Sequence, residues 1–151
     1  YIENEIFPNE QLADIMGRYI TSMCFMGIDG PEHMNAVCGY FEDHPRQQGM
    51  ISLIDMAIGA GEKLKLDPQT YVGVEVFGNV EIADGGEMEL GLYTTLSVGN
   101  NSTLTVKKGA RLAVNNTGLY SQDGSSIIVE NGADFEMNNN YQNSPANIIY
   151  K

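Results

Sequence analysis

The chain is poor in basic residues: 8 Lys and Arg stand against 20 Asp and Glu, which leaves a formal net charge of −12 at pH 7. Such a surface repels the phosphates of nucleic acid, and the sequence holds no Lys- or Arg-rich stripe to overcome that repulsion. Binding to an anionic membrane surface is disfavoured for the same reason. We therefore expect no nucleic-acid partner, and the acidity favours solubility or a cationic partner.

The sequence also lacks a run of 18 apolar residues, so we expect no transmembrane segment. A signal peptide is missing too, since the chain begins at Tyr1 without methionine and its first residues are acidic. We expect a processed or trimmed product, and this absence therefore says little about location.

Cysteine is scarce, with Cys24 and Cys38 alone in the chain. In an exported protein the two could close a disulfide loop that contributes about 3 kcal/mol. They could equally be small buried apolar residues. Together with His33 and His44 they are the only soft metal ligands, but their spacing matches no paired zinc pattern. We expect no metal and no cofactor.

Catalytic motifs are absent as well: the sequence has no G-x-S-x-G elbow and no Walker or Rossmann phosphate loop. Basic residues gather only at Lys107, Lys108 and Arg111, too few for a cleft that binds acidic polysaccharide. Most of the acidic side chains between residues 75 and 89 alternate with apolar ones, which indicates a solvated strand face rather than a catalytic carboxylate pair. These carboxylates are Glu75, Glu81, Asp84, Glu87 and Glu89. We expect no enzyme.

What the sequence does have is one small repeating unit, from Val80 to Val114. It consists of an apolar, an exposed and an apolar residue, followed by about five turn residues. The first members stand at positions 80, 88, 96, 104 and 112, an unbroken step of eight. Two more copies, at residues 127–129 and 135–137, resume this step after an irregular stretch. Each copy is too small to bury its own apolar face, so the copies must stack on one another.

The dimensions of the unit distinguish two all-β folds. Its three-residue strands are too short for good antiparallel hairpins, and its corners are longer than the favoured two-residue hairpin loops. A parallel β-solenoid accommodates both features, with two or three units, roughly 16–24 residues, in each coil. The predicted inward positions are Val80, Ile82, Met88, Leu90, Leu96, Val98, Leu104, Val106, Leu112 and Val114. The predicted outward positions are Glu81, Glu89, Ser97, Thr105 and Glu136, with Ile128 as an apolar exception.

The first third of the chain has a different pattern. Apolar residues at helical spacing predict a helix over about residues 10–25 and a second, short helix over residues 50–58. Residues 27–49 contain Gly, Pro, Asp, Asn and both histidines, which favours a loop with one strand around residues 36–41. The N-terminal helical segment is well placed to cover one open end of the solenoid.

After Gly61 the apolar period changes from 3.6 to 2, and the first strands are expected at residues 64–66 and 72–76. We therefore divide the chain into an α-containing N-terminal cap region, residues 1–60, and a β-solenoid repeat region with a C-terminal tail, residues 61–151. The fold class is mainly β: a short parallel β-solenoid with a small α-containing N-terminal cap.

The stretch from Leu104 to Val114 reads LTVKKGARLAV. It resembles the LxVxxGAxLxV coils of bacterial surface β-helix proteins, which include adhesins, autotransporter passengers and surface lipoproteins of gut Bacteroidetes. The resemblance covers about residues 62–137. It implies an exported protein at the cell surface or the outer membrane, and it transfers no catalytic or ligand-binding residue.

Specificity is expected where the repeat fails: at residues 27–49, at residues 118–126 and in the tail. Three tyrosines lie in predicted turns, where they would contact sugar or a protein, and the tail ends in an apolar triplet that folds back as a last strand or docks on another chain. The predicted contacts with a partner protein or a surface glycan are Tyr93, Tyr120, Ile128, Tyr141, Ile148, Ile149 and Tyr150.

These patterns predict a non-catalytic cell-surface module that binds or scaffolds, with an accessory lipoprotein of an outer-membrane assembly as one form of it. Two alternatives remain at this point. The first is a β-helix enzyme that processes polysaccharide, with its site on the solenoid flank. The second is a fragment of a phage fibre, which would be an intertwined trimer.

Overall fold

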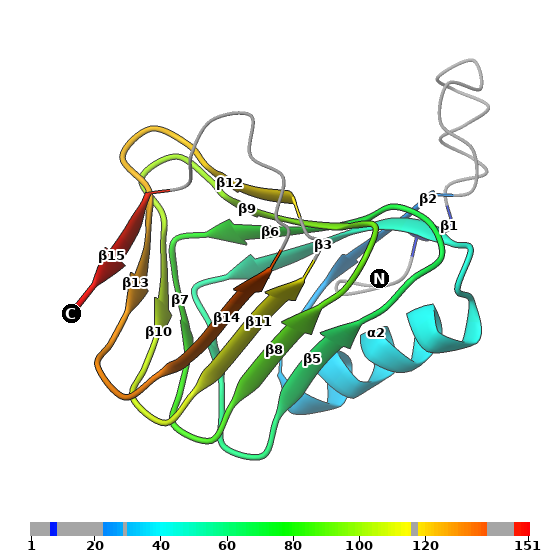
Figure 1. Cartoon of the computed structure of the whole chain (residues 1–151). Helices are drawn as coiled ribbons and strands as arrows, with labels where there is room; N and C mark the ends of the chain where they lie inside the picture. Colours follow the sequence, from blue (N-terminus) through cyan, green and yellow to red (C-terminus); the bar gives the residue numbers. More distant parts are fainter. Residues whose placement is uncertain (1–6, 9–22, 29, 116–117, 139–146) are drawn as a thin grey trace.

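The computed structural model describes residues 7–8, 23–28, 30–115, 118–138 and 147–151. The protein is mainly β, and its parallel strands form a solenoid of about five turns with one described helix near the N-terminus (Figure 1). The predicted fold class is therefore confirmed. Three sheets form the flanks of the solenoid.

The six-stranded sheet contains β1 (Phe7–Pro8), β2 (Met23–Gly27), β3 (Gln48–Ile54), β6 (Val72–Phe77), β9 (Thr94–Val98) and β12 (Gly118–Ser121). The five-stranded sheet contains β15 (Ile148–Tyr150), β13 (Ser126–Val129), β10 (Thr103–Val106), β7 (Asn79–Ile82) and β4 (Ala57–Ile58). The four-stranded sheet contains β14 (Asp134–Asn138), β11 (Arg111–Asn115), β8 (Glu87–Leu90) and β5 (Lys63–Leu66). Among the described strands, only β1 and β2 pair antiparallel.

Three consecutive strands, one on each sheet, make one coil: β6, β7 and β8 form one coil, and β9, β10 and β11 form the next. Lys63 pairs with Glu87 and Glu87 pairs with Arg111, so the coil advances by 24 residues there (63 to 87 to 111). Other coils advance by slightly less, by 22 residues from Val72 to Thr94 and by 23 from Arg111 to Asp134. Three units of eight residues therefore complete one coil, at the upper limit of the predicted range.

The core is a stack of apolar side chains along the inside of the solenoid. All ten predicted inward positions are buried, and the predicted outward positions are only partly covered. Because the strands stack in register, each buried side chain lies against its counterparts in the neighbouring coils: Leu112 stands between Met88 and Phe135. Full burial of one such side chain contributes about 1.5–3 kcal/mol.

A column of glycines turns the chain between the five-stranded and the four-stranded sheet. Gly61, Gly85, Gly109 and Gly132 have φ angles between 78° and 93°, the left-handed region that glycine enters without strain. The amide of Gly85 donates to the carbonyl of Gly109 at 3.1 Å, and the amide of Gly109 donates to Gly132 at 3.1 Å. The same conformation thus recurs at this corner in successive coils.

The structure differs from both helices predicted in the N-terminal region. Residues 10–22 lie outside the described part of the chain, and residues 23–25 belong to strand β2, so the predicted end of the first helix is wrong. The predicted helix over residues 50–58 is wrong as well, because strands β3 and β4 occupy it. Burial in β3 alternates from Gln48 to Leu53, which is the period of a strand.

The loop predicted over residues 27–49, with a strand around residues 36–41, is also wrong. This segment forms helix α2 (Pro31–Asp43), which starts with proline in its first turn. Met34, Val37 and Phe41 are buried on one face at helical spacing. Helix α2 packs against β5, at the N-terminal edge of the four-stranded sheet (Figure 1). A helix therefore covers part of that end, as expected, but it is formed by other residues.

The solenoid sheets extend across residues 60 and 61. Strand β3 pairs with β6, and β4 pairs with β7, so strands before and after this position share two sheets. The interruption predicted at residues 118–126 also contains a regular strand, since β12 pairs in parallel with β9. The tail folds back as a last strand, as expected, because β15 pairs with β13.

Within the described residues, no helix is long and apolar enough to cross a membrane.

Candidate functional site

The outer face of the four-stranded sheet carries a ladder of ion pairs. Its rows alternate in sign from strand to strand: β5 and β11 present cations, whereas β8 and β14 present carboxylates. This ionic ladder consists of Lys63, Glu87, Glu89, Arg111, Asp134 and Glu136. Opposite charges on adjacent strands attract one another, so the ladder supports the register of the sheet.

Glu89 stands at the centre of the ionic ladder, between two cations. Its carboxylate lies 3.2 Å from the ammonium of Lys63 and 3.4 Å from the guanidinium of Arg111. The hydrogen bond from Lys63 and the positive charges of Lys63, Lys65 and Arg111 lower the pKa of Glu89. The carboxylate is thus held ionised as a structural group.

This pKa shift predicts a pH-dependent contribution to stability. A lowered pKa in the folded state stabilises the protein above the ordinary glutamate pKa, and this stabilisation is lost as the pH falls through the lowered value. Glu89→Gln should lower the free energy of unfolding at pH 7 by up to about 1 kcal/mol, the range of an exposed pair. The difference from the parent should vanish in acid, as measured by urea unfolding at several pH values. Asp123→Asn, at an exposed turn, is the control, and an equal pH effect there would contradict the prediction.

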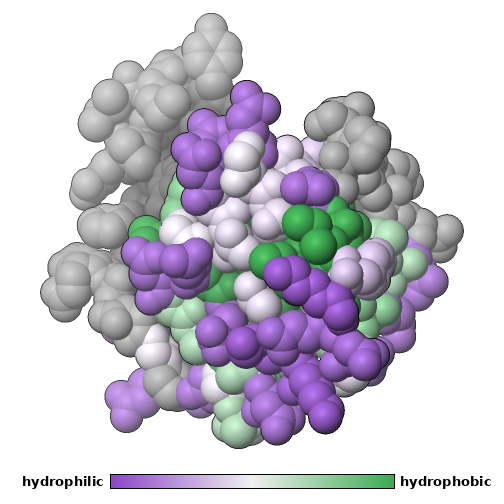
Figure 2. All heavy atoms as spheres, turned by 90° about the vertical axis from the view of Figure 1, so that its left-hand side faces the viewer, coloured by the Kyte–Doolittle hydropathy of each residue, from purple (hydrophilic) through white to green (hydrophobic). Residues whose placement is uncertain are grey.

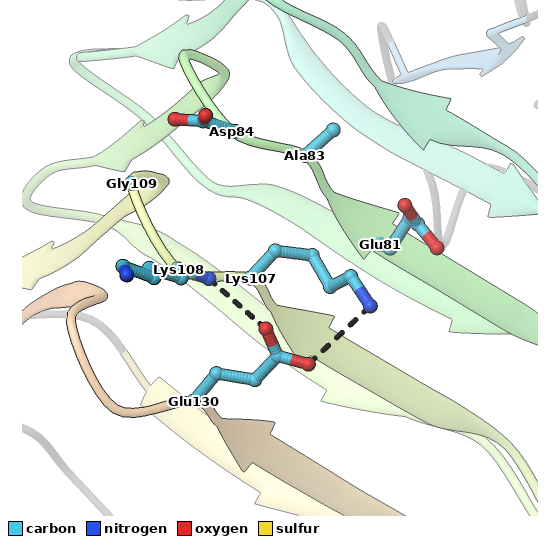
Figure 3. Close-up of a pocket in the computed structure, with 7 residues that line it drawn as sticks. All are labelled: Glu81, Ala83, Asp84, Lys107, Lys108, Gly109 and Glu130. Atoms are coloured by element: carbon cyan, nitrogen blue, oxygen red, sulfur yellow. Dashed lines mark hydrogen bonds and ion pairs between the residues drawn. The ribbon is translucent and has the colours of Figure 1, made fainter.

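A shallow hollow of about 470 Å³ lies where the five-stranded and four-stranded sheets meet (Figure 3). Glu130 reaches into it and accepts a hydrogen bond from the backbone amide of Lys108 at 3.0 Å, while its second oxygen lies 3.3 Å from the ammonium of Lys107. The Lys108 amide, and then Lys107, lower the pKa of Glu130. Glu81 and Asp84 lie on the far side of the hollow (Figure 3). Lys107 and Glu130 therefore form an ordinary exposed ion pair.

The residues that would serve a solenoid enzyme lie on different flanks. Glu81 belongs to β7 of the five-stranded sheet, whereas Glu89 and Arg111 belong to the four-stranded sheet and pair with each other. General acid–base chemistry needs its groups within reach of one reacting bond. The geometry does not bring these three residues together.

The outer face of the six-stranded sheet is different, because aromatic rings lie across it. The hydroxyl of Tyr71 lies 3.1 Å from the Thr95 hydroxyl and 3.7 Å from the Met50 sulfur. It stands above Gly73, where a Cβ atom would approach it to 2.6 Å. Tyr71 therefore spans three neighbouring strands, and glycine at position 73 makes the room for it.

Two further rings use glycine in the same way. A Cβ atom at Gly99 would come within 2.9 Å of the Phe77 ring, and one at Gly118 would come within 3.0 Å of the Tyr120 ring. Tyr71 is 39% exposed and Phe77 is 37% exposed. Each ring thus lies over a place where the sheet has no side chain.

A polar row runs between Tyr71 and Phe77, and Tyr120 continues this row on β12. Ser52, Glu75 and Ser97 face outward in register on β3, β6 and β9. Tyr71 covers Gly73 on one side of the row, and Phe77 lies on the other side. Positions 73 and 77 are about 13 Å apart along the strand, from the rise of about 3.3 Å per residue. We call this surface the aromatic face; it consists of Tyr71, Phe77, Thr95 and Tyr120 with the polar row Ser52, Glu75 and Ser97.

The structure separates the described contact residues expected from the sequence into four places. Tyr120 belongs to the aromatic face, in strand β12 rather than in the expected turn, and Tyr93 is exposed at the corner before β9 with a φ of 70°. Ile128 and Ile149 are neighbours on the outer side of the five-stranded sheet. Ile148 and Tyr150 continue the inward columns at the C-terminal end of the solenoid, and Tyr141 lies outside the described residues.

Sequence reasoning missed Tyr71 and Phe77. The signal for them lies in the glycines at positions 73, 99 and 118, which occupy outward strand or corner positions where side chains are expected. A glycine in a strand often marks the close approach of another group. Here the approaching groups are aromatic rings. Tyr71 and Tyr120 stand two positions from their glycines, whereas Phe77 lies over Gly99 of the next coil, a contact that becomes recognisable only once the 22-residue step between β6 and β9 is known.

Cys38 lies on α2 beside a groove of about 570 Å³ between this helix and the corner that follows β5. It is a free thiol whose sulfur contacts the carbonyl oxygen of Lys63 at 3.8 Å, and burial raises its pKa. Because Cys38 is a free thiol, the described residues form no disulfide, and the side chain of Cys24 is not among them. His44 stacks on the Tyr40 ring at 4.3 Å, and the described residues contain no group of three side chains that could hold a metal ion.

Comparison with known protein families, curated proteins and solved structures finds no match to this chain.

Proposed function

We propose that the protein is a non-catalytic binding module whose aromatic face binds a neutral carbohydrate. The observation that carries this proposal is the arrangement of Tyr71, Phe77 and Tyr120, which lie over glycines on one regular sheet. A sugar ring has apolar C–H faces and a rim of hydroxyl groups. Aromatic rings offer apolar surface for the first, and Ser52, Glu75 and Ser97 offer hydrogen-bond partners for the second.

The charges of the molecule favour a neutral ligand. Glu75 is the charged member of the aromatic face, and the chain as a whole carries a net charge of −12. Both repel the carboxylates or sulfates of an acidic polysaccharide. The other flanks support a binding role rather than catalysis, since Glu89 and Glu130 are engaged by cations in exposed pairs.

Removal of both principal rings should weaken carbohydrate binding at least tenfold. Tyr71→Ala together with Phe77→Ala deletes the exposed apolar surface on either side of the polar row, and tenfold corresponds to about 1.4 kcal/mol of binding free energy. A neutral ligand is first selected on a glycan array with the unaltered chain, and affinities are then measured by calorimetry.

Tyr150→Ala is the matched control, because Tyr150 is also an exposed tyrosine but belongs to β15 on another sheet. It should leave the affinity unchanged. Failure of the unaltered chain to retain any neutral glycan at millimolar concentration would contradict the proposal, as would an equal loss in the control.

A location at the cell surface, with lipoprotein or adhesin character, is part of the same proposal. Its support is the resemblance of residues 104–114 to the coils of bacterial surface β-helix proteins. Antibody labelling of intact cells of the source against permeabilised ones tests this location, and labelling only after permeabilisation would refute it.

A further inference from the structure

The two ends of the four-stranded sheet differ. At the N-terminal end, helix α2 packs against β5. At the C-terminal end, β14 pairs with β11, and within the described residues no strand or helix lies on its other side. Phe135 and Met137 continue the inward columns of Leu112 and Val114, yet Phe135 is only partly buried and Met137 is 39% exposed.

Figure 2 looks onto this C-terminal side of the solenoid, where the last strand of each sheet lies in Figure 1. Apolar surface lies near the centre of the view and to its right, with hydrophilic residues beside it and below it. The exposed apolar side chains of the last two strands in the chain are Met137, Ile149 and Tyr150. Met137 and Tyr150 continue the inward columns of Val114 and Val129, so this end presents part of the solenoid core.

The ionic ladder stops at this end on a row of carboxylates. Inside the ladder, Glu89 has a cation on each neighbouring strand, Lys63 on β5 and Arg111 on β11. In the last row, Asp134 and Glu136 receive the single guanidinium of Arg111 from one side, at 3.2 and 3.5 Å, and their side chains are 66% and 43% exposed. If the alternation of signs continued, a further strand beside β14 would carry basic side chains.

We propose that the outer edge of β14 binds an extended segment of a partner protein in which basic and apolar residues alternate. The segment adds a strand to the four-stranded sheet through backbone hydrogen bonds. Its basic side chains lie over Asp134 and Glu136, and its apolar side chains cover Phe135 and Met137. This surface and its partner are independent of the carbohydrate proposed for the aromatic face.

A second copy of the chain does not fit this edge. Two copies joined by their β14 strands would place the carboxylate rows side by side, and like charges on paired strands are destabilising. The chain does contain one strand with the required pattern, Lys63-Leu64-Lys65-Leu66 of β5, but α2 packs against it. In the fold this strand pairs with the acidic row of β8, so its sequence is a suitable probe.

The test measures binding of a fluorescent peptide with the sequence of residues 59–68 by anisotropy. A second peptide has glutamate in place of its two lysines. The unaltered chain should bind the lysine peptide at least tenfold more tightly than the glutamate peptide, and added salt should reduce the difference. Asp134→Lys with Glu136→Lys should reverse this preference.

Glu81→Lys with Asp123→Lys is the matched control, because it changes the net charge by the same amount on other parts of the surface. It should retain the preference for the lysine peptide. Asp134→Asn with Glu136→Gln keeps the side-chain shapes and removes their charges, so it should abolish the preference. This second variant tests the proposal even if the charge-reversed variant does not fold. Equal affinity for both peptides would overturn the proposal. So would a reversal in the control, or a dimer of the unaltered chain in light scattering that the charge-reversed variant abolishes.

Discussion

Replacement of Leu112 by alanine should lower the free energy of unfolding by about 2–5 kcal/mol, the range for large-to-small changes in a core. Leu112 is fully buried and stands in register between Met88 and Phe135. The backbones above and below it are fixed by the parallel ladder, so the walls of the resulting cavity cannot collapse without breaking strand pairing. Urea unfolding followed by circular dichroism measures the loss.

Leu92→Ala is the control for this experiment. Leu92 is 45% exposed in the corner between β8 and β9, and surface substitutions usually change stability by less than about 0.5 kcal/mol. Comparable decreases in the free energy of unfolding for the two variants would show that the stacked core of the described solenoid is not the main source of its stability.

Replacement of Gly109 by alanine should lower the free energy of unfolding by about 1–3 kcal/mol. At a φ of 83°, a residue with a Cβ atom is strained by roughly 1–2 kcal/mol. The new Cβ would also overlap the carboxylate of Asp84 in the preceding coil, which must move away. The measurement is again equilibrium unfolding.

The same chemical change at Gly39 should have the opposite sign. Gly39 lies within helix α2, and a Cβ there would meet no atom within 4 Å. Alanine is favoured over glycine inside a helix by about 0.5–1 kcal/mol, so Gly39→Ala should stabilise the protein. Destabilisation by both substitutions would mean that the strain of the left-handed corner is not the cause of the effect at Gly109.

The sequence was sufficient to predict the solenoid and its inward positions, because a step of eight repeats the same apolar pattern many times. It was not sufficient for residues 50–58. The apolar residues of this segment fit one face of a helix, yet Ile51 and Leu53 also fit the period of a strand, and only pairing of β3 with β6 decides between the two. Tertiary pairing overrides local pattern in such short segments.

Helix α2 was missed for the opposite reason. Gly30, Pro31 and the two histidines are typical of a loop, and they outweighed the helical spacing of Met34, Val37 and Phe41 in the prediction. The aromatic face could not be predicted either. The contact of Phe77 with Gly99 joins residues one coil apart, and the repeat alone left the coil at two or three units, while the contacts of Tyr71 and Tyr120 with glycines two positions away depend on the orientation of each ring.

The alternating charges of the four-stranded sheet answer a problem that a repetitive chain poses to its own folding. An apolar step of eight looks the same after every unit, so a coil that slips by eight residues still buries apolar side chains. The charges are not repeated in this way: a slip would move Lys63 from Glu87 to Asn79 or Thr95, and the ion pair would be lost. The ladder therefore distinguishes the correct pairing of the coils from pairings shifted by eight residues, which is a role in specificity beyond its small contribution to stability.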